Sequence, residues 1–239
     1  MNLLNKELQK ALAAKTEFLN NISHEVRTPI QGFTSISQGL VEHWNSFDDS
    51  KKFKFVTQVA SSAKRLGSLM NNLLDLSKFT ADKMFMDFKS MDLNLSIEEV
   101  IEECKTLYLN TKSIEIIFHQ CKDANLVGDK ERIGQVLRNI FANAIKFSSD
   151  KGKIIASLTS SNDSLHFSIS DEGVGIPPTE LKEIFDPFTQ SSRTKTRAGG
   201  TGLGLSIAKE IIDAHHGKIW AENNIEGGSC FHFIIPKKI

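Results

Sequence analysis

The residues of this chain with the clearest chemical potential lie in the segment NNISHEVRTP, at positions 20–29. His24 is followed at once by an acid, Glu25, and Thr28 and Pro29 come shortly afterwards. An exposed imidazole can act as a nucleophile, and a neighbouring carboxylate can orient it or take the proton of its second ring nitrogen. Because the segment lies inside an amphipathic helical pattern, these side chains have a stiff support. The pattern predicts a histidine that accepts a phosphoryl group.

A second group of polar residues stands on a predicted helix, in the segment NIFANAIK at positions 139–146. Asn139 and Asn143 are spaced so that they share one helix face, and Lys146 lies nearly one turn further on. Amide oxygens can bind Mg²⁺ while water and phosphate complete its shell, and a lysine adds a positive charge for phosphate. The alternative interpretation is an ordinary solvated helix face.

Two glycine-containing segments favour a nucleotide site. The first, DEGVGIP at 171–177, follows a predicted strand, so the carboxylate of Asp171 can accept a hydrogen bond from an exocyclic amine such as that of adenine. Gly173 and Gly175 let the backbone turn and approach a flat base beside Ile176. The second, GGTGLGL at 199–205, opens a predicted helix whose free N–H groups can bind phosphate. Its predicted binding residues are Gly200, Thr201, Gly202, Leu203 and Gly204.

Taken singly, these two segments have other interpretations, namely an ordinary turn for the first and a flexible linker for the second. Between them lies FDPF at 185–188, followed by a polar stretch that contains Arg193, Lys195 and Arg197. An apolar anchor beside a basic loop suits a lid over a triphosphate. A solvated charged loop is the alternative. Arg193 and Lys195 are the candidates for a contact with phosphate.

Together the motifs resemble the catalytic core of a sensor histidine kinase of two-component signalling. In the family's order, its phosphoacceptor box, asparagine box, first glycine box, phenylalanine box and second glycine box resemble NNISHEVRTP, NIFANAIK, DEGVGIP, FDPF and GGTGLGL. The likeness covers nearly the whole chain. It implies an α + α/β protein, in which a dimerising helical hairpin precedes an α/β ATP-binding domain of the Bergerat type.

The resemblance implies a role for each part of the hairpin motif. His24 would attack the γ-phosphate of ATP, and Glu25 would act on the other ring nitrogen. The phosphoryl group would then pass to an aspartate on the receiver domain of a response regulator. Thr28 stands where relatives that also dephosphorylate their regulator have a residue that positions water. We further hypothesise that Pro29, which cannot donate to the carbonyl of Glu25, loosens the helix there and lets the bundle flex.

In the second domain the resemblance assigns Mg²⁺ to Asn143 with Asn139 nearby, phosphate to Lys146 and the adenine base to Asp171. One position departs from part of the family, because Gln190 stands where some members have an arginine that contacts the γ-phosphate. The lid contact is therefore assigned to Arg193 or Lys195.

Apolar periodicity predicts two long helices in residues 1–80, the dimerisation and phosphotransfer hairpin. Their apolar stripes run through residues 8–40 and 55–76, separated by the polar break WNSFDDS at 44–50. A lone hairpin cannot cover both stripes, so we expect two copies to pair as a homodimeric four-helix bundle.

Residues 81–239 are predicted to be the ATP-binding domain, an α/β sandwich with one mixed sheet and helices on one face. Strands are expected at 114–118, 153–158, 165–170, 218–221 and 229–235, the last two as a hairpin. Helices should begin at a capping box of Ser96 and Glu99, at an Asp129 cap, and at Thr201. The buried face of the middle helix should contain Ile133, Val136, Leu137, Ile140, Phe141 and Ile145.

Composition narrows the remaining classes. The 29 basic and 29 acidic residues cancel, which argues against nucleic-acid partners and hence against a gyrase-like or mismatch-repair-type ATPase. No apolar run approaches the roughly 20 residues of a membrane span, so we expect no membrane contact by this part. Three scattered cysteines fit a cytoplasmic setting, as in the cytoplasmic portion of a longer sensor. The remaining alternatives are a catalytically silent dimeric scaffold and a core that acts mainly as a phosphatase.

Overall fold

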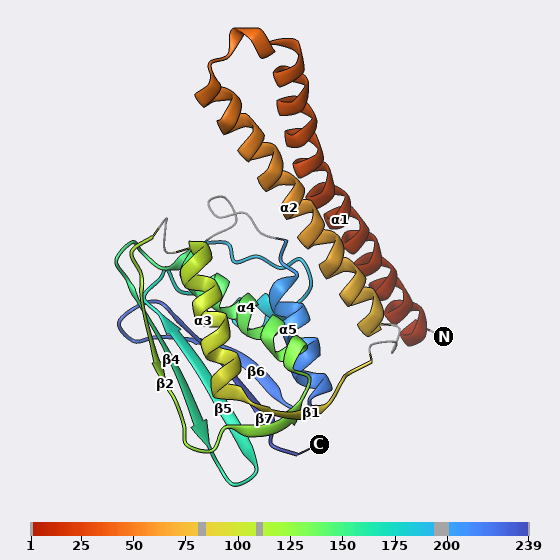
Figure 1. Ribbon diagram of the computed structural model, residues 1–239. Helices are drawn as coiled ribbons and strands as arrows, with labels where there is room; N and C mark the ends of the chain where they lie inside the picture. The colour runs from red at the N-terminus through yellow and green to blue at the C-terminus, as the bar shows by residue number, and fades with distance from the viewer. Residues whose placement is uncertain (1, 81–84, 109–111, 194–200, 239) are drawn as a thin grey trace. The chain divides into compact units, whose positions relative to one another are not determined.

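The computed structural model describes residues 2–80, 85–108, 112–193 and 201–238 (Figure 1). It divides into two compact units, Met1–Ser77 and Lys78–Ile239. The helical unit contains α1 (Asn2–Glu42), the short 3-10 helix η1 (Trp44–Ser46) and most of α2 (Asp49–Thr80). The turn between the two helices falls in the polar break predicted at residues 44–50, so the helical hairpin is confirmed.

Each helix of the hairpin buries only part of its apolar stripe. Leu40, Leu69 and Leu76 are buried, but many other large apolar side chains of this unit are not. The exposed ones are Leu19, Ile30, Phe33, Val41, Trp44, Phe53, Val56, Met70 and Leu74. The apolar positions predicted before residue 19 lie outside the described side chains. An apolar surface of this extent is rarely left open to water in a folded protein.

Helix α1 runs through Pro29 without a break, and Pro29 itself is buried. The proline has no N–H to donate to Glu25, but a single missing bond does not end a helix that packs against a neighbour. The hydroxyl of Thr28 donates to the carbonyl oxygen of His24 at 3.1 Å. Helix α1 therefore continues through the position at which we expected Pro29 to loosen it.

The second unit is an α/β sandwich. Its five-stranded sheet has the order β2-β4-β5-β7-β6, with β2 (Glu115–His119) parallel to β4 and all other pairs antiparallel. The remaining bounds are β4 (Lys153–Ser160), β5 (Ser164–Asp171), β6 (Lys218–Asn223) and β7 (Ser229–Pro236). Helices α3 (Leu93–Tyr108), α4 (Lys130–Phe147) and α5 (Gly204–Ala214) cover one face of this sheet (Figure 1). The mixed sheet, its one-sided helical layer and the closing hairpin are confirmed.

The prediction of a single sheet was wrong, because β1 (Lys89–Asp92) and β3 (Asn125–Gly128) pair as a separate two-stranded sheet. Each of these strands has only four residues, which is too short to show an alternating pattern.

Two predicted helix starts were also wrong. Helix α3 begins at Leu93, because Asp92 rather than Ser96 caps it: the Asp92 carboxylate accepts the N–H of Asn94 at 2.8 Å. Helix α5 begins at Gly204 rather than Thr201, because Gly202 has a φ of +65° that no helix contains. Helix α4 follows its prediction.

The core lies between the sheet and its three helices. Asp129 caps α4 by accepting the N–H of Arg132 at 3.1 Å, and all six side chains predicted for the buried face are buried. The ring of Phe141 on α4 lies 6.1 Å from that of Phe167 on β5, which stacks at 5.0 Å on Phe233 of β7. Helix α4 is thus fixed against the middle of the sheet, which positions the polar residues on its other side.

Candidate functional site

The centre of the candidate nucleotide site is Asp171, the last residue of β5, which is only 2% exposed. Its Oδ1 accepts the N–H of Gly173 at 2.8 Å and that of Ser229 at 3.3 Å, and its Oδ2 accepts the hydroxyl of Ser229 at 2.6 Å. Burial raises the pKa of Asp171, while the bonds from Ser229 and Gly173 act in the opposite direction. Three donors hold this buried carboxylate in one orientation. A fixed orientation is what a carboxylate needs to select one kind of hydrogen-bonding group on a ligand.

The backbone around Asp171 leaves no space for side chains. A Cβ at Gly173 would lie 2.6 Å from the carbonyl oxygen of Phe147, at the end of α4. A Cβ at Gly228, where φ is +85°, would fall on the carbonyl oxygen of Asp171. Asn224 donates its amide to the same oxygen at 2.9 Å. Close approach of these segments to the buried carboxylate therefore requires glycine at both positions.

Sequence reasoning missed Ser229, Gly228 and Asn224. The signal that was available is the Gly227-Gly228 pair just before the last strand, because two adjacent glycines with φ of +107° and +85° mark a turn that other residues rarely adopt. Nothing in the order of residues indicated that this turn comes back to the end of β5.

The first glycine segment is fixed by two side chains. Asn223 forms a reciprocal pair with the backbone of Ile176, accepting its N–H at 2.8 Å and donating to its carbonyl at 2.6 Å. The guanidinium of Arg193 donates to the carbonyl oxygen of Val174 at 2.7 Å. Gly175 has a φ of +67° between them. Arg193 thus contacts the predicted base-binding segment, and its assignment to phosphate stays a prediction.

Helix α4 brings the asparagine motif to the same region. The side-chain NH₂ group of Asn139 donates to the carbonyl oxygen of Gly204, the first residue of α5, at 3.0 Å, a bond that does not use the amide oxygen of Asn139. Asn143 is half-buried one turn further along, and the ammonium of Lys146 lies 4.8 Å above the ring of Phe147. The asparagine motif and the second glycine segment are therefore neighbours.

The end of α4 has an unexpected support in Lys112. Its ammonium donates to the carbonyl oxygens of Ile145, Lys146 and Ser148 at 2.9, 3.0 and 2.8 Å. The last carbonyls of a helix have no partners within it and carry partial negative charge, so a cation there is favourable. Lys112 fixes the helix end from which Asn143 and Lys146 extend.

The second glycine segment closes against the phenylalanine motif. The carbonyl oxygen of Gly202 accepts the N–H of Phe188 at 2.9 Å, and a Cβ at Gly202 would lie 2.6 Å from the Phe188 carbonyl carbon. The hydroxyl of Thr201 accepts the N–H of Leu203, a fully buried residue, at 3.3 Å. Gly200, Lys195 and Arg197 lie outside the described residues.

The phosphoacceptor motif lies in the helical unit. His24 is exposed on α1, and Thr28 is exposed one turn later. The carboxylate of Glu25 extends toward α2, where its Oε2 is 3.6 Å from Nη2 of Arg65. Nothing in the pattern of residues indicated this ion pair, which involves the acid directly beside the histidine.

Comparison with known proteins finds a matching family for each of the two units. Residues 14–82 match the family described as His Kinase A (phospho-acceptor) domain. Residues 128–239 match the family described as Histidine kinase-, DNA gyrase B-, and HSP90-like ATPase. A solved catalytic domain of the histidine kinase ThkA is 35% identical and aligns over its whole length with 64% of this chain, at a TM-score of 0.58. The chain belongs to the histidine kinase family.

Two further relatives give the context of this histidine kinase core. Sensor histidine kinase WalK of Bacillus subtilis is 35% identical over 97% of this chain, which spans 38% of the WalK sequence. The structure of ThkA in complex with the response regulator protein TrrA is 28% identical, covers 96% of this chain and 64% of the other, and has a TM-score of 0.73. The chain therefore matches the catalytic-core part of these longer relatives. Within its described residues, every helix is too short or too polar to cross a membrane.

Proposed function

We propose that the chain transfers the γ-phosphoryl group of ATP to His24 and then to an aspartate of a response regulator. The observation that carries this proposal is the combination of an exposed histidine beside an acid in one unit with a buried carboxylate at a glycine-lined strand end in the other. Residues 1–80 are the phosphotransfer hairpin in this proposal, and residues 81–239 bind ATP. A gyrase-like enzyme would need only the second feature.

In the reaction, a ring nitrogen of His24 forms a bond to the γ-phosphorus as the bond to the bridging oxygen breaks and ADP leaves. Glu25 interacts with the other ring nitrogen and stabilises the positive charge that develops there. Arg65 contacts one carboxylate oxygen of Glu25 and leaves the other free for the ring. A base that is itself oriented by a third group is a common arrangement around activated nucleophiles.

The residues around Asp171 fit an adenine nucleotide. The buried carboxylate can accept the exocyclic amine of the base, and the glycine-rich turns let the backbone come close to a flat ring. Asn143 and Asn139 would hold Mg²⁺ through their amide oxygens, which are suitable ligands for this ion. When bound, the ion neutralises charge on the β- and γ-phosphates. Lys146 and the start of α5, from Thr201 to Gly204, would contact the phosphates.

We assign the exposed apolar side chains of the hairpin to a second copy of the chain. Pairing two hairpins into a four-helix bundle would cover Ile30, Phe33 and Met70, which a monomer leaves in water. The structure of ThkA with TrrA supports a response-regulator receiver domain as the partner that takes the phosphoryl group. We propose a cytoplasmic location as well, which the three free cysteines favour.

The test is incorporation of label from γ-labelled ATP with Mg²⁺, comparing the wild-type chain with His24→Gln. Label that is stable to alkali, sensitive to acid and absent from the variant is expected. Label that persists in His24→Gln would refute the choice of phosphoacceptor. Measurable ATP binding without any labelling would favour a silent scaffold.

A phosphatase activity toward the regulator is the second candidate function. Thr28 is exposed one helical turn after His24, so both side chains face the same partner surface. We expect Thr28→Ala to keep autophosphorylation while it slows loss of phosphate from a phosphorylated receiver domain. Equal rates for both chains in that assay would argue against the assignment of Thr28.

A further inference from the structure

His215 is the C-cap residue that follows helix α5, is completely buried, and is not part of the nucleotide site. Its Nδ1 lies 2.7 Å from the carbonyl oxygen of Ile211, which can only accept, so Nδ1 carries a proton. Its Nε2 lies 3.0 Å from the backbone nitrogen of Asp129, which can only donate, so Nε2 is unprotonated. The two partners together define a neutral ring in one tautomer. Burial lowers the pKa of His215, which agrees with this state.

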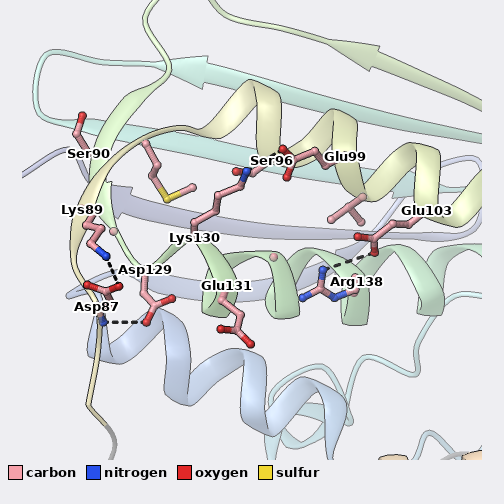
Figure 2. A pocket seen from close by; sticks show the side chains of 14 residues that line it. Asp87, Lys89, Ser90, Ser96, Glu99, Glu103, Asp129, Lys130, Glu131 and Arg138 are labelled. Atoms are coloured by element: carbon pink, nitrogen blue, oxygen red, sulfur yellow. Dashed lines mark hydrogen bonds and ion pairs between the residues drawn. The ribbon is translucent and has the colours of Figure 1, made fainter.

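Asp129 also binds the segment at residues 85–88, which precedes β1 in the sequence. While its Oδ1 caps α4 by accepting the N–H of Arg132, its Oδ2 accepts the N–H of Asp87 at 2.9 Å. The ring of Phe88 meets that of His215 edge to face at 5.1 Å. We call Asp87, Phe88, Asp129 and His215 the joint. Figure 2 shows Asp87 and Asp129 at one end of a cavity of about 550 Å³ between α3 and α4.

The same joint holds one end of a helix pair whose other end forms the nucleotide site. The start of α4 is bound to the end of α5 through Asp129 and His215. Near the opposite end of α5, the amide of Asn139 is bound to the carbonyl of Gly204. The two helices are therefore antiparallel, and α5 is tied at both of its ends, to the start and to the middle of α4. Because α5 is a short helix held at these two places, we expect a change at one tie to alter the position of α5 relative to α4 at the other.

We propose that His215 is a positioning residue that ties α4 and α5 to the chain entering at Asp87, and that this tie opens when the ring takes a second proton. A doubly protonated ring presents N–H groups on both sides, so its Nε2–H would face the N–H of Asp129 and the bond would be lost. Nucleotide affinity and the anchoring of residues 85–88 then decrease together. Only the nucleotide readout depends on the proposed function.

The charged groups around the ring act in both directions. The carboxylate of Asp129 favours the charged ring, whereas burial and the neighbouring His216 oppose it. Asp87 and Lys89, on the entering chain, form an ion pair with each other at 2.6 Å and largely cancel. The Asp129 carboxylate already accepts two backbone N–H groups, and the contact of Nε2 is with the backbone N–H of Asp129, so a second imidazole proton forms opposite a donor rather than an acceptor.

The direct test is an NMR titration of the full chain labelled with ¹⁵N, from about pH 8 to about pH 5, a range that brackets histidine protonation. Near neutral pH, the ring signals of His215 should report a proton on Nδ1 alone. The backbone amides of Asp129 and Asp87 should shift together as the ring takes a second proton. A charged ring near neutral pH, a proton on Nε2, or an Asp87 amide that does not respond would overturn the proposal.

Three variants sharpen the test. His215→Gln can still accept the Asp129 N–H but cannot titrate, so it should remove the shared shift. His216→Asn removes an exposed imidazole whose side chain makes no hydrogen bond within the described residues, so it should leave that shift in place. His215→Asn is too short to reach Asp129 and should weaken binding of Mg-ATP about fivefold, the effect of one lost hydrogen bond.

Mg-ATP affinity is measured by equilibrium fluorescence titration with a labelled analogue. Unchanged affinity in His215→Asn would overturn the positioning role. If that variant does not fold, the wild-type titration and His215→Gln decide the matter. If the wild-type chain binds no ATP at all, the proposed nucleotide site fails, while the NMR result still tests the joint.

Discussion

Replacing Asp171 with Asn separates two effects of its buried carboxylate. One is its cost to the stability of the folded protein, and the other is its contribution to the affinity for a nucleotide. The side chain is only 2% exposed, and burial raises the pKa of its carboxyl. Asn keeps an oxygen at the Oδ1 position, which can still accept the N–H groups of Gly173 and Ser229. Its new NH₂ group replaces Oδ2, where the hydroxyl of Ser229 can turn and accept instead of donate.

The two consequences have opposite signs. Because no internal hydrogen bond is lost and a buried charge disappears, the free energy of unfolding of the ATP-binding unit at neutral pH should be unchanged or higher. A hydrogen bond to a charged group contributes about 1.5–3 kcal/mol, so binding of an adenine nucleotide should weaken roughly 10- to 150-fold. The NH₂ group of Asn also faces a donor on adenine but an acceptor on guanine, so the preference for ATP over GTP should decrease.

The assay is a pair of calorimetric titrations with Mg-ATP and Mg-GTP, combined with urea unfolding of the same samples. Ser229→Ala is the matched control, because it removes a donor to Asp171 but keeps the carboxylate. That control should lose about 1–3 kcal/mol of stability and keep its preference for ATP. An Asp171→Asn chain that binds ATP with unchanged affinity, or that becomes clearly less stable, would refute the reasoning.

Three further outcomes are expected. Gly228→Ala should lower the unfolding free energy of the ATP-binding unit by about 3 kcal/mol or more in urea unfolding, since its Cβ would meet a backbone oxygen. Gly227→Ala is the control: this position also has a positive φ but has open space around it, so the unfolding free energy should fall by only about 1–2 kcal/mol. Arg65→Met should lower the rate of autophosphorylation severalfold with little change in the KM for ATP, because it frees the acid beside the phosphoacceptor; a rate that falls equally in Lys64→Met, a nearby charge removal, would speak against this. Because burial lowers the pKa of His215, its unfolded form binds more protons below about pH 6.5, so unfolding free energy should fall as the pH drops through that value. Urea midpoints that do not change between neutral and mildly acidic buffer would contradict the last expectation.

Long periodic elements could be predicted from the sequence because their signals are local. Helix α4 has its cap at Asp129 and an apolar residue at nearly every inward position, so its bounds and its buried face followed directly. The helical hairpin was predictable for the same reason. The starts of α3 and α5 could not be predicted. For α3, the sequence contains two possible caps, and the one used is Asp92 rather than the capping box at Ser96. For α5, the positive φ of Gly202 prevents the helix from beginning at Thr201.

The nucleotide residues were predictable as types but not as neighbours. Asp171 at a strand end indicated recognition, yet its two bonds from Ser229 join residues 58 positions apart. Pairing across strands is equally invisible in the sequence: His232 on β7 stacks on Trp220 of β6 at 5.0 Å and lies 3.2 Å from the ring nitrogen of His166 on β5. Separately these residues had no shared spacing, so they gave no sign of forming one cluster on the outer face of the sheet.

The three bonds donated by Lys112 at the end of α4 also affect its chemical reactivity. Acylating reagents attack an amine through a free lone pair, and an ammonium that gives all three of its protons to carbonyl oxygens must first be released from them. Among the many exposed lysines of this chain, Lys112 should therefore be one of the slowest to be labelled. Its labelling rate then reports how firmly the last turn of α4 is closed, without any probe having to be introduced into the protein.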